Sequence, residues 1–327
     1  MLKWRLLLGT AIILALIGLC WLDAQADLPQ GMQRVHIGLP GAALMPVVLL
    51  LTVLATQEVL RLARAANLRP AAPAIYTANL LMVLAQWMPE VNLYVISLLQ
   101  RPHQPPNEFD YLPHVEMIFA GSQSALWALA LGVGLIFVAE MRRFEKPGGA
   151  LANIAVGVFC LVYVGMMCTF AVQMRLFWGV GALAAWIVSV KMGDIGAYTF
   201  GRLFGRTRMS PTISPGKTME GAIGAILFAC LGSWVSFHGL VQMAPPSVNP
   251  MPGAPIGWLI FGVLMGLAGI VGDLAESLLK RDVGCKDSSS WLPGFGGVLD
   301  ILDSLLLTAP VAWLCWAMGI VGVGKGM

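Results

Sequence analysis

Long apolar runs recur along the whole chain, and they constrain its fold more than any other feature. Hydrophobic residues make up 58% of the sequence and charged residues only 11%, whereas a soluble protein carries about 25% charge. Runs of about 20 apolar residues are long enough to cross a bilayer as helices. The short alternating segments of a membrane β-barrel are not visible. The sequence therefore predicts an all-α, polytopic membrane protein.

Nine segments have the length and apolar character of membrane-spanning helices. They cover approximately residues 5–22, 39–60, 74–99, 117–140, 151–172, 176–192, 220–240, 256–279 and 299–322. We divide the chain into N-terminal transmembrane helices, 1–150, and a C-terminal transmembrane catalytic region, 151–327. The reason for this division is that the segments able to carry chemistry lie in the second part.

Lysines and arginines are distributed unevenly between the two sides of this layout. With the N-terminus inside, sixteen of the 20 basic residues fall on the inner side, as the positive-inside rule requires. We therefore expect a protein of the cell (inner) membrane, with segments 193–218 and 280–298 facing the cytoplasm. Ala24-Gln25-Ala26 resembles a signal-peptidase site, but the preceding run is long enough to span, so we favour its retention.

Several classes of function are disfavoured because the residue patterns that they require do not occur in the sequence. The six cysteines form no CxxC spacing and the four histidines no HExxH pair, so neither a disulfide framework nor a zinc site is indicated. The net charge is only +3 and no basic run is present, which gives no sign of nucleic-acid binding.

A glycine-rich segment from Gly193 to Gly221 is the first that could carry chemistry. Its basic residues suit phosphate groups, and its glycines allow a ligand to approach the backbone closely. These basic residues are Arg202, Arg206, Arg208 and Lys217. The ending Gly-Lys-Thr suggests a P-loop, but Pro211 occupies the position of the required glycine and no strand is predicted before it. An ordinary basic loop on the inner side is an equally good interpretation of this segment.

Acidic residues lie inside the last two apolar segments. Asp273 and Glu276 are three residues apart and share a helix face. Glu276 can pair with Lys280, four residues on, whereas Asp273 lies about 10 Å inside the charged end of the helix. A charged group at such depth costs about 2.5–3.5 kcal/mol at least, unless it pairs or faces a protein interior.

A second acidic pair, Asp300 and Asp303, starts the last segment after the turn Pro-Gly-Phe-Gly-Gly. An aspartate at a helix start complements the helix dipole, which explains Asp300 better than Asp303. Converging carboxylates are hard ligands that suit Mg²⁺, especially when substrate phosphates complete its coordination. A metal ion with several lysines and arginines is typical of phosphoryl or nucleotidyl transfer, and the membrane setting points to a lipid substrate.

These segments resemble the phosphatidate cytidylyltransferases, also called CDP-diacylglycerol synthases. The family's signature is matched at its spacing by Ser277, Lys280-Arg281, Lys286-Asp287, Ser289, Leu292-Pro293, Gly296-Gly297, Asp300 and Asp303. The stretch from Asp194 to Gly221 resembles the family's upstream motif. Phe295 stands where the pattern has histidine, and Ile301 where it has arginine. We expect the protein to be active with both residues as they stand.

The resemblance implies transfer of a cytidylyl group from CTP to phosphatidic acid, with Mg²⁺ as cofactor. The expected catalytic residues are Asp273, Lys280, Arg281, Lys286, Asp287 and Asp300. The expected substrate-binding residues are Arg202, Lys217, Ser277, Gly296 and Gly297, and the expected metal ligands are Asp273, Asp300 and Asp303. The bilayer is the third partner, and a homodimer is compatible with this interpretation. The alternatives are a related lipid kinase, a nucleotidyltransferase with a different lipid substrate, and an ion-coupled transporter.

Overall fold

Helices dominate the computed structural model, which describes residues 2–25, 41–89, 91, 114–241, 253–286, 288–289 and 296–322. Within these residues, six helical runs are long and apolar enough to cross a membrane. They are Met45–Ala65, Gly121–Arg143, Ala150–Phe204, Met219–Leu240, Gly257–Asp282 and Leu299–Ala317. The prediction of an all-α membrane protein is confirmed at this level.

The elements follow the apolar segments of the sequence closely. In chain order they are α1 (Leu2–Gln25), α2 (Met45–Ala65), α3 (Ala72–Leu84), η1 (Ala85–Trp87), α5 (His114–Arg143), α6 (Ala150–Cys160), η3 (Leu161–Met166), α7 (Met167–Phe204), β1 (Arg208–Ser210), β2 (Ser214–Thr218), α8 (Met219–Val235), η4 (Ser236–Leu240), α10 (Gly257–Asp282) and α11 (Leu299–Ala317). Helix α3 is shorter than the predicted segment 74–99, whose remaining residues lie mostly outside the described part of the chain.

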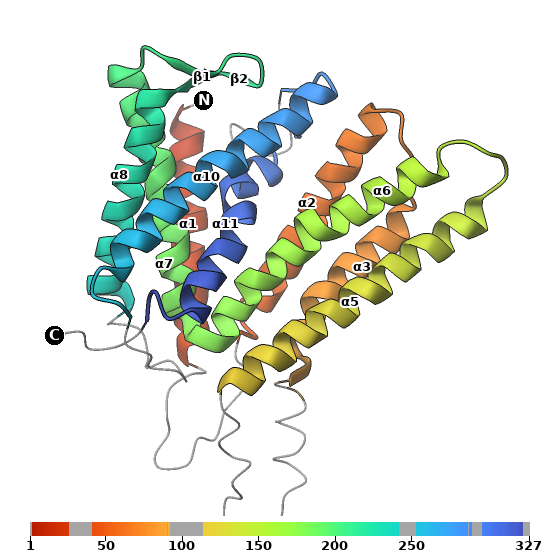
Figure 1. Cartoon of the computed structure of the whole chain (residues 1–327), viewed down its shortest axis with the longest axis horizontal. Helices are drawn as coiled ribbons and strands as arrows, with labels where there is room; N and C mark the ends of the chain where they lie inside the picture. Colours follow the sequence, from red (N-terminus) through yellow and green to blue (C-terminus); the bar gives the residue numbers. More distant parts are fainter. Residues whose placement is uncertain are drawn as a thin grey trace, which may run out of the picture.

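The run from α6 to α7 changes direction sharply at a residue with a non-helical backbone. Gly179 has φ 82° and ψ −177°, a backbone conformation that residues with a Cβ rarely adopt. Figure 1 shows α6 descending along the bundle and α7 ascending again. The two predicted segments 151–172 and 176–192 are therefore two arms of one 55-residue run, with the bend just inside the second.

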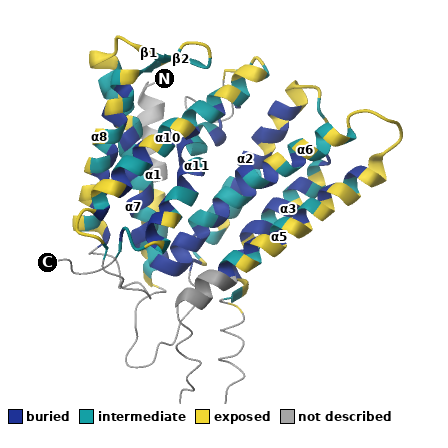
Figure 2. Ribbon diagram, in the orientation of Figure 1, coloured by how far each residue is buried: buried dark blue, intermediate teal, exposed yellow. Residues whose placement is uncertain are grey.

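The helices form two groups that meet along a buried seam. In Figure 1, α2, α3, α5 and α6 lie on one side, while α7, α8, α10 and α11 lie on the other with α1. Helix α7 packs mainly against α8, and α10 packs against both α8 and α11. Figure 2 shows the buried residues concentrated where these helices face one another, and the exposed residues on the outer faces.

A small hairpin, which the sequence analysis did not predict, connects α7 to α8. Strands β1 and β2 are antiparallel, with Arg208 opposite Thr218. Gly216-Lys217-Thr218 lies within β2 itself, and the Thr218 side chain accepts a hydrogen bond from the Gly221 amide at 3.1 Å, capping α8. The hairpin sits at the same end of the bundle as the end of α10 (Figure 1). It brings Lys217 of β2 into contact with α10.

Candidate active site

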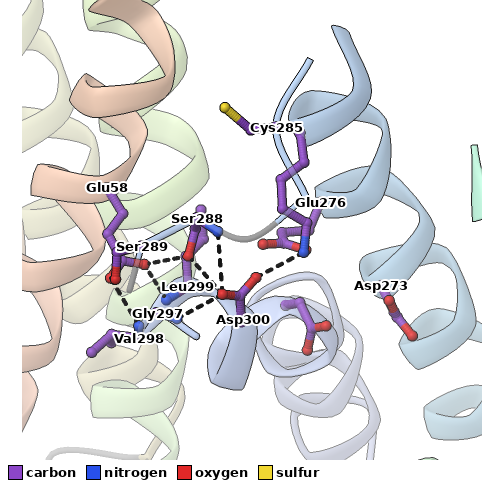
Figure 3. Close-up of polar contacts among 12 residues, drawn as sticks. Glu58, Asp273, Glu276, Cys285, Ser288, Ser289, Gly297, Val298, Leu299 and Asp300 are labelled. Atoms are coloured by element: carbon purple, nitrogen blue, oxygen red, sulfur yellow. Dashed lines mark hydrogen bonds and ion pairs between the residues drawn. The ribbon is translucent and has the colours of Figure 1, made fainter. Parts of the chain in front are cut away.

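Asp300 lies in the first turn of α11, where several donors meet it (Figure 3). Its carboxylate accepts hydrogen bonds from Lys280 Nζ at 2.7 Å and from the Gly297 amide at 2.6 Å. The Ser288 Oγ lies 2.9 Å from the same carboxylate. The helix start and the preceding turn therefore hold this predicted site residue in one orientation.

Lys280 connects Asp300 to a second carboxylate. It also forms an ion pair with Glu276, one helical turn before it on α10, so the predicted pairing of these two residues is confirmed. Glu276 is fully buried, with 0% of its surface exposed. One ammonium group therefore bridges two carboxylates that come from different helices.

The sequence analysis missed a carboxylate on α2 that joins this group. Glu58 is only 3% exposed, and it accepts hydrogen bonds from the hydroxyls of Ser288 and Ser289 at 2.7 and 2.9 Å. Figure 3 shows it facing the turn that leads into α11. The signal was present, because an acidic residue inside an apolar run needs a partner. Its partner lies 230 residues away, where no local pattern can identify it.

Lys217 and Asp273 form the second lysine–carboxylate pair of the site. The Lys217 Nζ lies 2.7 Å from an Asp273 carboxylate oxygen, so β2 is fastened to α10. The Asp273 side chain is 38% exposed and the Lys217 side chain 22%. Two residues that we predicted for different roles, one for phosphate and one for metal, are in direct contact.

Asp303 belongs to a third group, which again includes residues that were not predicted. Asp273, Asp194 and Lys191 lie close enough to Asp303 for their charges to interact with it. The Lys191 Nζ donates to Asp194 and to the Ile301 carbonyl oxygen, both at 2.9 Å. A lysine from α7 therefore lies beside position 301, where this chain has isoleucine in place of the expected arginine.

The remaining predicted residues differ in how directly they join these groups. Arg202 is exposed and donates to the Tyr198 hydroxyl at 2.9 Å. Arg281 donates to the Ile213 carbonyl at 3.3 Å, linking α10 to the hairpin. Lys286 is exposed, and Ser277 is half-buried on α10. Asp287 and Phe295 lie outside the described residues.

Gly296 and Gly297, predicted to contact substrate, fit tightly against the acidic groups instead. A Cβ on Gly296 would overlap the Asp300 carboxylate, and a Cβ on Gly297 would overlap Ser288 and Glu58. Gly296 also has φ 83°, which favours glycine. These residues allow the turn to approach the carboxylates closely, while their predicted contact with substrate stays a prediction.

The donor chemistry suits Mg²⁺, although the carboxylates alone do not form a complete cage. No group of three or more His, Cys, Asp or Glu side chains is arranged to hold a metal ion among the described residues. Asp273 and Asp303 bring like charges close together, which a divalent cation would offset. Mg²⁺ commonly takes one or two carboxylates and completes its coordination with water and substrate phosphates. The residues present therefore fit a metal held jointly with the substrate.

Comparison with known proteins agrees with this chemistry. The model of the Cytidylyltransferase family matches residues 33–318. The chain is 32% identical to the phosphatidate cytidylyltransferase of Mycobacterium bovis over 233 residues, covering 63% of this chain and 72% of the relative. It is 36% identical to the phosphatidate cytidylyltransferase of Chlamydia pneumoniae over 220 residues, covering 65% of each.

A third relative matches a shorter region. The chain is 40% identical over 118 residues, 36% of each chain, to the uncharacterized protein YnbB of Escherichia coli. The family match extends from before α2 to the end of α11, so it includes every lysine–carboxylate pair described above. A transporter or a lipid kinase is not favoured by these relationships. The chain belongs to the cytidylyltransferase family.

Proposed function

We propose that this protein transfers a cytidylyl group from CTP to phosphatidic acid, giving CDP-diacylglycerol and pyrophosphate for phospholipid synthesis. The observation that carries the proposal is that the pairs Lys217–Asp273 and Lys280–Asp300 join β2 to α10 and α10 to the start of α11, within the region matched by the family. Both pairs combine a cation for phosphate with a hard oxygen ligand for metal. The two relatives described above that carry an activity in their names are phosphatidate cytidylyltransferases.

The reaction needs positioning and charge neutralisation rather than a covalent nucleophile. A phosphate oxygen of the lipid attacks the α-phosphorus of CTP, the bond to the β-phosphate oxygen breaks, and pyrophosphate leaves. Lys217 and Lys280 are held beside the site by their carboxylate partners and would bind phosphate oxygens. Asp273, Asp300 and Asp303 would hold Mg²⁺, which neutralises charge on the phosphates when bound.

We further propose nine membrane crossings with the site at the cytoplasmic face. Helix α1 begins and α11 ends at opposite ends of the bundle (Figure 1), which supports an odd number of crossings. With the reversal at Gly179 the 55-residue run would cross twice, and α1 with 24 residues and α3 with 13 would supply the two crossings beyond the six apolar runs. The excess of lysine and arginine at the end that carries the hairpin supports the orientation. Assembly as a homodimer stays a prediction, which cross-linking in membranes would test.

The test is a reaction of the purified, full-length protein in detergent with phosphatidic acid, Mg²⁺ and CTP labelled at the α-phosphate. The expected result is label in a CDP-diacylglycerol product, with one pyrophosphate released for each product. A parallel reaction with ATP labelled at the γ-phosphate tests the kinase alternative. Label transferred to lipid from ATP, with none from CTP, would overturn the proposed function.

A further inference from the structure

Glu58 is a buried carboxylate for which the reaction described above has no use. It lies on α2, in the other group of helices, and is 3% exposed. It accepts four hydrogen bonds, all from the segment 288–299: two from serine hydroxyls and two from backbone amides. A buried carboxylate with so many donors is held in one position.

Two of these bonds replace a helix cap that α11 lacks. The amides of Val298 and Leu299 donate to Glu58 at 3.0 and 2.8 Å. The residue at the N-cap position of α11 is Val298, which makes no side-chain capping bond. The first amides of a helix need acceptors, and a negative charge there is favoured by the helix dipole. Glu58 supplies both functions from 240 residues away.

The other contacts of Glu58 lead directly to Asp300. The Ser288 Oγ lies 2.7 Å from Glu58 and 2.9 Å from Asp300, and its single proton can be donated to only one of them at a time. Gly297 fits against Glu58 so closely that a Cβ would overlap it, and the Gly297 amide donates to Asp300 at 2.6 Å. Any shift of Glu58 is therefore passed to the donors that orient Asp300 (Figure 3).

We propose that Glu58 is a positioning residue for the cytidylyltransfer reaction. It fixes the 288–299 turn and the start of α11, and through them it sets the orientation of Asp300. The role rests on the proposed function, and it has Glu58 act through the 288–299 segment and not on the substrate directly. The N-terminal helices therefore complete the active site instead of only embedding it in the membrane.

Glu140 provides a matched control, because it is also a buried glutamate near the end of a membrane helix. It is 6% exposed and accepts hydrogen bonds from the Ala71 amide at 2.8 Å and from Arg143 at 3.3 Å. It lies on α5, away from the turn. Glu140→Gln and Glu58→Gln make the same chemical change, so a difference between them reports position and not the general cost of losing a buried charge.

The experiment compares the two variants by kinetics and by backbone amide exchange of the full-length protein in detergent. Outer partners of functional groups typically contribute about 10–100-fold to activity. We expect Glu58→Gln to lower kcat by about 10–100-fold while KM for CTP changes by less than about threefold. At least one of the amides of Val298 and Leu299 should exchange at least about tenfold faster, since they donate to different oxygens of Glu58 and glutamine keeps only one acceptor oxygen. Glu140→Gln should change neither kcat nor the exchange of these two amides.

The amide exchange separates failure of this role from failure of the proposed function. If the natural protein makes no CDP-diacylglycerol, the proposed function is wrong. Amide exchange then still tests whether Glu58 accepts hydrogen bonds from Val298 and Leu299. Unchanged exchange at Val298 and Leu299 in Glu58→Gln, or an equal loss of kcat in Glu140→Gln, overturns the positioning role. If Glu58→Gln does not fold, Ser289→Ala replaces it, because it removes one of the four hydrogen bonds to Glu58. This variant must then show a smaller fall in kcat and a smaller rise in the exchange rates of Val298 and Leu299.

Discussion

Replacing Lys280 by methionine tests the charge arrangement of the site most sharply, because one ammonium group serves two carboxylates. The change leaves Glu276, which is 0% exposed, without its ion-pair partner. Breaking a buried ion pair by removing one partner costs about 3–5 kcal/mol, because the other charge stays buried and uncompensated. Asp300 keeps the Gly297 and Ser288 donors, so the loss there is smaller.

Such a loss is measurable as thermal stability of the purified protein in detergent. At about 2–4 °C for each kcal/mol in a protein of this size class, we expect the apparent Tm to fall by about 6 °C or more. Adding Glu276→Gln should restore at least about half of the lost stability, since it removes the uncompensated charge. Activity should stay low in both variants, because Asp300 and the phosphates still lack the ammonium group.

Arg64→Met is the control for loss of a positive charge, because Arg64 is exposed in the last turn of α2. A surface substitution of this kind should change stability by no more than about 0.5 kcal/mol. The reasoning is refuted if Lys280→Met melts at the temperature of the natural protein. It is also refuted if the double variant regains full activity together with its stability.

Three further predictions concern the metal, the turn and the topology. Asp300→Asn and Asp273→Asn should each abolish turnover of CTP and phosphatidic acid, while the melting temperature stays near that of the natural protein. Near-full activity in both variants would contradict their assignment as metal ligands. Gly297→Ala should reduce turnover by at least about tenfold, since the added Cβ overlaps Glu58 and Ser288; an unchanged rate would show that the turn is free to move. Single cysteines at Thr207 and Lys286 should react with impermeant reagents only from the cytoplasmic side, and labelling of either from outside would exclude a shared cytoplasmic site.

Local patterns in the sequence predict the helices well because membrane insertion depends on local apolarity. The predicted segments 256–279 and 299–322 correspond to Gly257–Asp282 and Leu299–Ala317. The break between two predicted segments near residue 176 corresponds to the bend at Gly179. The hairpin at Arg208–Thr218 was not predicted, because its short polar strands have no apolar alternation to reveal them.

Sequence patterns identified the acidic residues of the site only where two of them recur on one helix face. Asp273 with Glu276 and Asp300 with Asp303 have this spacing, and all four lie in or beside the lysine–carboxylate groups. Glu58 and Asp194 are single acidic residues, and Lys191 was counted only as a basic residue on the inner side. Lys191 and Asp194 contact each other three residues apart, but their contacts with α11, and those of Glu58 with Ser288, span more than 100 residues. Contacts across that separation depend on tertiary packing, which the local sequence does not encode.

The most direct measurement of the central claim is the CTP reaction of the natural sequence, with Phe295 and Ile301 in place. Lys191 lies 2.9 Å from the Ile301 carbonyl oxygen, so the site keeps a cation beside the position where arginine was expected. We therefore predict Mg²⁺-dependent formation of CDP-diacylglycerol from CTP and phosphatidic acid by the unmodified protein. No product from the natural sequence, but clear product after Phe295→His with Ile301→Arg, would contradict the account and indicate a relative with a different substrate.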